Sequence, residues 1–186
     1  MNLICLDIDG CCNSNHTEEE LVCKPFVYIG LDDIYLERLA YIIKYTKAKI
    51  LLTSDWGALD PNGAHRKYLE EKFKQHNLSI DYIIDWSQYH REERTIAIKD
   101  WISEHDVDRY VIIDDEYFYG YQDPEIKEHL FYCFDDKEIP AHFCGITENM
   151  KYRIIAYLLG CWGLKEPYKD EDAVKYIKNK WGGVRD

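Results

Sequence analysis

Two carboxylates lie one residue apart near the start of the chain, in the segment Asn2-Leu-Ile-Cys-Leu-Asp7-Ile-Asp9-Gly10. Because side chains alternate along a strand, Asp7 and Asp9 could share a face if strand geometry continues that far, and Gly10 then permits a sharp turn. Two carboxylates this close repel each other unless a cation neutralises them, and oxygen clusters of this kind suit Mg²⁺. The simpler alternative is a strand that ends in an Asp-Gly turn.

Two other apolar segments also end in polar side chains. Residues 48–52 are followed by Thr53 and Ser54, and residues 110–113 are followed by Asp114 and Asp115. The carboxyl ends of parallel strands meet at one edge of a sheet, so these side chains are expected to converge on Asp7 and Asp9. The four carboxylates Asp7, Asp9, Asp114 and Asp115 would then need a hard divalent cation, and Mg²⁺ would keep waters and take a phosphate oxygen.

Phosphate chemistry at such a site needs two further kinds of group. Hydroxyl and backbone N–H groups at Thr53 and Ser54 could hold phosphate oxygens. A positive side chain is needed to offset charge in the transition state. Arg94, at the start of a predicted helix, is the first candidate, Lys99 is the second and Arg91 is the third. Lys99 is also expected to bind substrate, together with Thr53 and Ser54.

The elements that must position these residues alternate between strands and helices. Strands are predicted from residue 2 and at 48–52, 79–84, 110–113 and 130–134. Helices are predicted from Asp32 or Asp33 to about Lys47, through Leu69 and Phe73 to about Asn77, from about Arg94 to His105, from the N-cap Thr147 to Leu159, and around 173–181. Residues 12–30 are predicted to form a loop or small flap. This alternation predicts an α/β fold, a three-layer α/β/α Rossmann-like parallel sheet with at most a minimal cap.

The composition fits one globular domain of enzyme size. The chain has 186 residues, 46% of them hydrophobic, and a net charge of −12. This charge argues against binding nucleic acid through bulk electrostatics. No apolar segment is long enough to span a bilayer and no export signal is evident, so we expect no membrane partner and a cytoplasmic protein. Seven cysteines without zinc spacing are expected to be free thiols, and a soft-metal site at Cys11 and Cys12 is disfavoured.

The ordered motifs resemble the haloacid-dehalogenase-like (HAD) hydrolases. The resemblance rests on Asp7-Ile-Asp9-Gly10, Ile50-Leu-Leu-Thr53, Arg94 or Lys99, and Val111-Ile-Ile-Asp114-Asp115, in that order. Thr53-Ser-Asp-Trp56 and Gly145-Ile-Thr147 are similar to the compact HAD domains of the "Swiss army knife" RNA-repair type. The chain departs from that pattern at Cys11, where Thr or Val is usual, and at Gly57, where Arg is frequent.

The resemblance implies a role for each matching residue. Asp7 would attack phosphorus and form an aspartyl-phosphate, and Asp9 would act as general acid and then as general base. The carboxylates of Asp7 and Asp115 and the backbone carbonyl of Asp9 would hold Mg²⁺, with Asp114 nearby. Thr53 would hydrogen-bond the phosphoryl group.

The expected function is therefore Mg²⁺-dependent hydrolysis of a phosphate monoester. A minimal cap would leave room for a nucleic-acid end, whereas the acidic charge keeps nucleotides, sugar phosphates and phosphoproteins as alternatives. A catalytically idle binding module of the same fold is the alternative from another class. We assign the catalytic domain to residues 1–160 and a helical extension packed on the same domain to residues 161–186.

Overall fold

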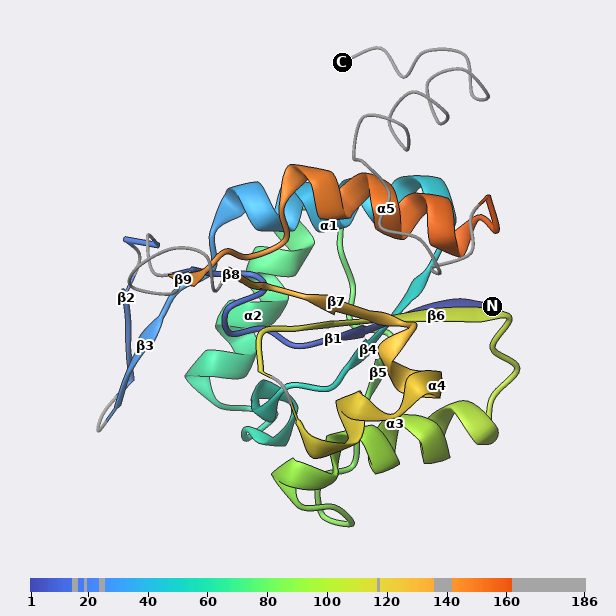
Figure 1. Ribbon diagram of the computed structural model, residues 1–186. Coiled ribbons are helices and arrows are strands. Elements are labelled where there is room, and N and C mark those ends of the chain that lie inside the picture. Colours follow the sequence, from blue (N-terminus) through green and yellow to red (C-terminus); the bar gives the residue numbers. More distant parts are fainter. Residues whose placement is uncertain (15–16, 19, 24–25, 117, 136–141, 162–186) are drawn as a thin grey trace.

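A computed structural model describes residues 1–14, 17–18, 20–23, 26–116, 118–135 and 142–161. Its centre is a five-stranded parallel sheet with the strand order β5-β4-β1-β6-β7 (Figure 1). The strands are β1 (Asn2–Leu6), β4 (Lys49–Leu52), β5 (Tyr82–Ile83), β6 (Arg109–Asp114) and β7 (Leu130–Tyr132). The predicted α/β architecture is confirmed. The strand expected at 79–84 is shorter than predicted.

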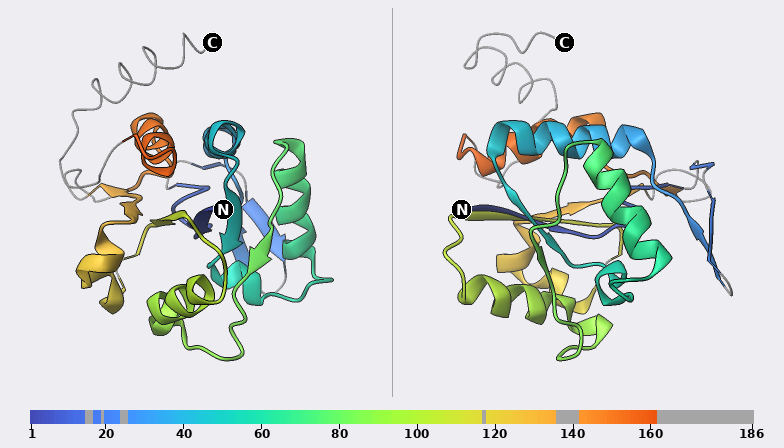
Figure 2. Two further views of the ribbon diagram at one scale, coloured as in Figure 1. Left: turned by 90° about the vertical axis from the view of Figure 1, so that its right-hand side faces the viewer. Right: turned by 180° about the vertical axis from the view of Figure 1, so that it is seen from behind.

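Helices cover both faces of the sheet. The helices are α1 (Asp33–Thr46), α2 (Ala64–Gln75), α3 (Arg94–Ser103), α4 (Pro124–Lys127) and α5 (Glu148–Leu158). Alternate residues of β1 point to opposite faces: Ile4 and Leu6 pack with α1, α2 and α5, whereas Leu3 and Cys5 pack with α3 and α4. Figures 1 and 2 show α1 and α5 on one side of the sheet and α3 and α4 on the other.

The ends of two helices follow from capping side chains that the sequence predicts. The carboxylate of Asp32 accepts a hydrogen bond from the backbone N–H of Ile34, and the hydroxyl of Thr147 accepts one from Met150. Lys47 ends α1 in the left-handed conformation, with a φ of 55°. The helix α3 begins at Arg94 as expected and ends two residues before His105.

Two short antiparallel hairpins lie outside the main sheet. Within residues 12–30, β2 (Glu20–Cys23) pairs with β3 (Phe26–Ile29), and this hairpin extends away from the sheet in Figure 1. The other hairpin pairs β8 (Phe134–Asp135) with β9 (His142–Phe143), so the strand expected at 130–134 is divided between β7 and β8. Three 3₁₀ helices, η1 (Asp55–Ala58), η2 (Arg91–Glu93) and η3 (Tyr119–Gln122), occupy loops after the strands.

The described part of the chain contains no helix long and apolar enough to cross a membrane. Six cysteines are described as free thiols, which agrees with the expected absence of disulfides among them. The helix expected at 173–181, and all but the first residue of the extension assigned to 161–186, lie outside the described residues. That domain assignment stays a prediction.

Candidate active site

Polar side chains from three adjacent strands meet at one edge of the sheet. Asp7 follows β1, Thr53 follows the neighbouring β4, and Asp115 follows β6 on the other side of β1. Main-chain hydrogen bonds fix this arrangement: the Asp7 N–H donates to the carbonyl of Ile113 at 2.9 Å, and the Thr53 N–H donates to the carbonyl of Leu6 at 2.9 Å. The parallel sheet therefore brings together the residues that the sequence separates by up to 108 positions.

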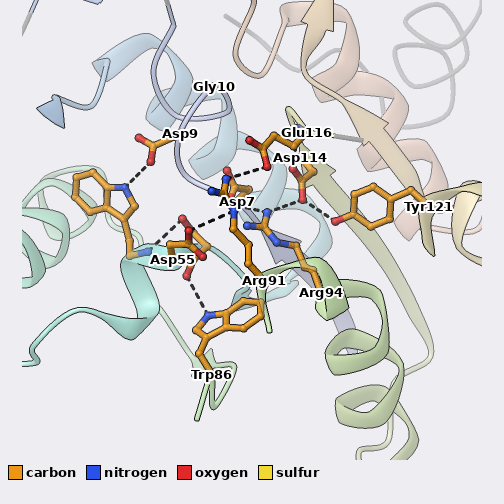
Figure 3. Close-up of polar contacts among 12 residues, drawn as sticks. Asp7, Asp9, Gly10, Asp55, Trp86, Arg91, Arg94, Asp114, Glu116 and Tyr121 are labelled. Carbon is orange, nitrogen blue, oxygen red and sulfur yellow. Dashed lines mark hydrogen bonds and ion pairs between the residues drawn. The ribbon is translucent and has the colours of Figure 1, made fainter. Parts of the chain in front are cut away.

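Arg94 is the cation at the centre of this site (Figure 3). Its side chain is 2% exposed, and a single nitrogen, Nη1, donates to Asp7 Oδ1 at 2.9 Å and to Asp114 Oδ2 at 2.7 Å. The hydroxyl of Tyr121 donates to the same Asp114 oxygen at 2.6 Å. The first turn of α3 thus supplies a buried guanidinium that links the ends of β1 and β6.

Burial and charge act against each other at this ion pair. Burial raises the pKa of Asp7 well above its usual value, the charge of Arg94 lowers it, and Asp114 and Asp115 raise it further. Burial also disfavours the charged guanidinium, but Asp7 and Asp114 outweigh this effect and raise the pKa of Arg94. Three carboxylates therefore crowd around one positive charge, and a second cation would relieve the remaining repulsion.

Asp7 and Asp115 provide oxygen ligands for such a cation. Carboxylate oxygens of Asp7 and Asp115 and the sulfur of Cys11 lie within 4.8 Å of one another. Burial is the main cause that raises the pKa of the Cys11 thiol, and a hard cation such as Mg²⁺ prefers oxygen to sulfur ligands. The remaining carboxylate oxygens fit a hard divalent cation such as Mg²⁺, which also takes water and phosphate oxygens.

Gly10 allows Asp115 to approach the end of β1. Gly10 has a φ of 67°, in the left-handed region that side chains with a Cβ rarely adopt. A Cβ at this position would overlap the carboxyl group of Asp115. Burial, together with the charges of Asp114 and Glu116, raises the pKa of Asp115 to about 7.

Asp9 is placed differently from the other carboxylates. Its side chain is exposed, and it points in Figure 3 toward an indole ring rather than toward Asp7. Trp56 Nε1 donates to Asp9 Oδ2 at 2.9 Å, and Asn13 Nδ2 donates to Asp9 Oδ1 at 3.1 Å. The side chain of Asp9 is not part of the group of possible metal ligands found among the described residues. Asp7 and Asp9 therefore occupy distinct environments.

The loop after β4 supplies polar groups of a different kind. The Thr53 hydroxyl is buried and has no hydrogen-bond partner in the part of the chain that the structure describes. The Ser54 hydroxyl accepts from the Trp56 N–H at 3.4 Å, and the Ser54 carbonyl accepts from Trp86 Nε1 at 3.2 Å. An unsatisfied buried hydroxyl carries an energetic cost, which a bound phosphoryl oxygen would remove.

Of the three basic residues considered from the sequence, Arg94 alone contacts Asp7 within the described structure. Lys99 Nζ instead lies 2.5 Å from Asp123. Arg91, at the rim of the site, pairs with Glu116 at 2.8 Å and with Asp55 at 3.4 Å. Lys99, expected to bind substrate, therefore has its partner beside α4.

Sequence reasoning did not identify Asn13, Phe118 or Tyr121 as parts of the site. Tyr121 lies in η3 and Phe118 directly precedes it, in a segment for which no element was predicted; the Phe118 ring lies 4.4 Å from Arg94 Cζ. No local pattern marks Phe118 or Tyr121, because their positions depend on how the loop after β6 folds back. Asn13 was missed for a similar reason, because its bond to the Gly10 N–H depends on how the turn after β1 folds.

One comparison with known proteins yields a match. A family model described as the HAD domain in Swiss Army Knife RNA repair proteins matches residues 3–140. The matched range includes Asp7, Thr53, Arg94, Asp115 and Tyr121. No curated protein and no solved structure matches the chain.

Proposed function

The chain belongs to the family of HAD domains in Swiss Army Knife RNA repair proteins, and from this we propose that it is a Mg²⁺-dependent phosphatase acting through Asp7. The observation that carries this proposal is the environment of Asp7. This carboxylate is buried, bound by the Arg94 guanidinium, close to Asp115, and next to the strand end that bears the unsatisfied Thr53 hydroxyl. The residues proposed as nucleophile, cation, metal ligand and hydrogen-bond donor to the phosphate thus come from neighbouring strand ends and the helix beside them.

In the first half of the proposed reaction, a carboxylate oxygen of Asp7 attacks phosphorus. The Asp7 oxygen–phosphorus bond forms as the bond from phosphorus to the leaving oxygen breaks, and Asp9 gives its proton to that oxygen. Burial raises the pKa of Asp7, and the charge of Arg94 opposes this effect and so favours the ionised, nucleophilic form. The Thr53 hydroxyl donates a hydrogen bond to an oxygen of the transferring group.

In the second half, water attacks the phosphorus of the aspartyl-phosphate. Asp9, now ionised, takes the proton of this water, and the bond between phosphorus and Asp7 breaks to release inorganic phosphate. The carboxylates of Asp7 and Asp115 and the backbone carbonyl of Asp9 would hold Mg²⁺, with Asp114 fixed behind them by Arg94 and Tyr121. When bound, Mg²⁺ would neutralise charge on the phosphoryl oxygens.

The substrate class we propose is a phosphate monoester on a large molecule, with a nucleic-acid end as the first candidate. The family description names RNA repair proteins, and the hairpin β2–β3 is the sole described insertion between β1 and α1. The net charge of −12 opposes long-range attraction of nucleic acid, so recognition would depend on the phosphorylated end itself. Nucleotides and small phosphate esters are the comparison substrates.

The proposal is tested by measuring phosphate release from 4-nitrophenyl phosphate with and without Mg²⁺. Activity should require Mg²⁺ and should be lost in Asp7→Asn, because an amide cannot form the aspartyl-phosphate. Asp60→Asn is the matched control: Asp60 is exposed, and its side-chain oxygen accepts from the Asn62 N–H, a bond that Asn can also form. Activity that survives in Asp7→Asn would overturn the mechanism. A panel of phosphorylated oligonucleotides, nucleotides and metabolites then ranks the substrates.

A second measurement separates the phosphatase from an idle binding module. Beryllium fluoride with Mg²⁺ mimics the phosphoryl group on an aspartate and should raise the thermal unfolding midpoint of the wild-type protein. The same addition should have no effect on Asp7→Asn. Absence of any shift in the wild-type protein would favour the idle module.

A further inference from the structure

The carboxylate of Asp9 is bound at both of its oxygens by side chains from two different segments. Trp56, in η1 after β4, donates its indole N–H to Oδ2 at 2.9 Å, and Asn13, in the turn after β1, donates its amide to Oδ1 at 3.1 Å. Asp9 is nevertheless exposed to solvent. An exposed carboxylate can satisfy its hydrogen bonds with water, so two fixed protein donors serve to set its direction.

Trp56 is a donor whose aromatic ring is buried. Its side chain is 2% exposed, and its ring packs near those of His65 and Tyr68. The indole therefore lies inside the protein, and its only polar atom is directed at Asp9, the proposed general acid. Buried indole N–H groups usually find a partner, but a main-chain carbonyl would serve equally well. Trp86 in the same site shows that alternative, since its N–H binds the carbonyl of Ser54.

The amide of Asn13 is fixed as well. Its oxygen accepts from the Gly10 N–H at 2.7 Å, and its nitrogen also lies 3.4 Å from the carbonyl of Ile29 in β3. Asn13 therefore shapes the turn around Gly10 in addition to binding Asp9. A substitution at Asn13 would disturb both, whereas Trp56→Phe removes the N–H group that binds Asp9 and keeps an aromatic ring.

We propose that Trp56 is a positioning residue for Asp9, whose indole N–H holds the carboxylate where it protonates the leaving oxygen. This inference rests on the proposed phosphatase function. In an in-line displacement the leaving oxygen lies on the far side of phosphorus from the nucleophile, so the acid must stand apart from Asp7. Figure 3 shows that separation: Asp7 is directed to Arg94, and Asp9 is directed to the indole of Trp56.

The test uses Trp56→Phe, which keeps an aromatic ring and removes the N–H donor. Its activity is measured on an alkyl phosphate and on 4-nitrophenyl phosphate. An alkoxide leaving group needs a proton from Asp9, whereas nitrophenolate leaves without one. We expect kcat on the alkyl phosphate to fall about 10-fold more than kcat on 4-nitrophenyl phosphate, part of the roughly 10²–10⁴-fold that a general acid supplies. KM should change little on either substrate.

Two variants serve as references. Asp9→Asn should show the same dependence on the leaving group as Trp56→Phe, with a larger loss. Trp86→Phe makes the same chemical change at the other indole of the site, where the acceptor is a main-chain carbonyl, and should leave the ratio of the two activities unchanged. Combining Trp56→Phe with Asp9→Asn should cause no additional loss on the alkyl phosphate, because both substitutions remove the same proton transfer.

Equal losses on the two substrates in Trp56→Phe would overturn the inference and leave the proposed function intact. If the wild-type protein hydrolyses neither substrate, the proposed function fails instead. If Trp56→Phe does not fold, benzothienylalanine at position 56 replaces it, because this residue keeps the fused ring and has sulfur in place of the N–H group. The same change in the activity ratio is then required, and an unchanged ratio overturns the inference.

Discussion

The guanidinium of Arg94 lies 2.9 Å from the carboxylate of Asp7 in the closed interior of the protein. The same nitrogen that makes this contact also binds Asp114. A buried ion pair costs desolvation energy, and removing one partner leaves the other charge buried without compensation. Here burial raises the pKa of the proposed nucleophile, and the charge of Arg94 acts in the opposite direction by favouring the ionised carboxylate.

Replacing Arg94 with Met should cost both stability and activity. The substitution leaves two buried carboxylates without their partner, which typically destabilises a protein by about 3–5 kcal/mol. Phosphatase activity should fall by about 100-fold or more, since one charged donor at the reaction centre is removed. Denaturant unfolding and phosphate release measure the two effects.

Arg94→Lys is the matched variant. One nitrogen makes both contacts in the wild-type protein, and a lysine ammonium also donates several hydrogen bonds from one nitrogen. We therefore expect Lys to recover most of the stability and a measurable part of the activity. Equal behaviour of Met and Lys at this position would contradict the assigned role of the positive charge.

Thr53→Val should separate stability from activity. The Thr53 hydroxyl is buried without a hydrogen-bond partner among the described residues, so its removal relieves a cost of about 1–3 kcal/mol. The unfolding midpoint should stay the same or rise, while kcat falls by roughly 10–100-fold because a donor to the phosphoryl group is lost. Thr53→Ser keeps the hydroxyl and should stay close to wild type in kcat. A destabilised Thr53→Val protein would show that the hydroxyl has a structural partner.

The sheet, and the meeting of the candidate site residues at one of its edges, could be predicted from the sequence because both depend on local patterns. Buried parallel strands appear as short apolar runs, and their carboxyl ends are marked by the first polar residues, as at Asp7, Thr53 and Asp114. The choice of Arg94 over Lys99 was not settled by the sequence, since both lie on the same helix. Only the packing of α3 against the sheet determines which side chain reaches Asp7.

Contacts that depend on the return of a loop could not be predicted. Tyr121 binds Asp114 because the segment after β6 folds into η3 and back over the sheet edge. The bond between Trp56 and Asp9 likewise joins two segments 47 residues apart. Trp56 is buried, and the partner of its indole N–H follows from tertiary structure alone.

Gly10→Ala should weaken metal binding. The left-handed backbone costs a residue with a Cβ roughly 1–2 kcal/mol, and the new methyl group would push the Asp115 carboxylate away from Asp7. Mg²⁺ affinity, read from the rise of the unfolding midpoint with Mg²⁺ concentration, should fall by about 10-fold, equivalent to about 1.4 kcal/mol.

Gly160→Ala controls for the backbone strain. Gly160 also has a positive φ, of 68°, but a Cβ there would meet the guanidinium of Arg109, the end of a flexible side chain away from the site. This variant should lose similar stability without losing Mg²⁺ affinity. Unchanged affinity in Gly10→Ala would remove Asp115 from the proposed metal site.

The stability of the metal-free protein should fall as the pH rises from about 4 to about 7. The pKa of Asp115 is raised from 3.8 to about 7, mainly by burial. Between these values the folded protein retains a proton that the unfolded chain releases, so each step up in pH favours the unfolded chain, and the loss is complete above the folded pKa. The raised pKa of Asp7 acts in the same direction. Asp115→Asn should flatten this pH dependence, whereas Asp60→Asn should not.

Mg²⁺ should reverse this loss of stability, and more strongly at pH 8 than at pH 5. A cation binds the ionised carboxylates, so at pH 5 it must displace the proton from Asp115, and at pH 8 that proton has already gone. At 100 times its dissociation constant Mg²⁺ would add about 2.7 kcal/mol, or roughly 5–10 °C in the unfolding midpoint of a chain this size. Calorimetry at the two pH values, with Ca²⁺ and Mg²⁺ compared, measures the effect. An equal shift at both values would mean that the cation binds away from Asp7 and Asp115.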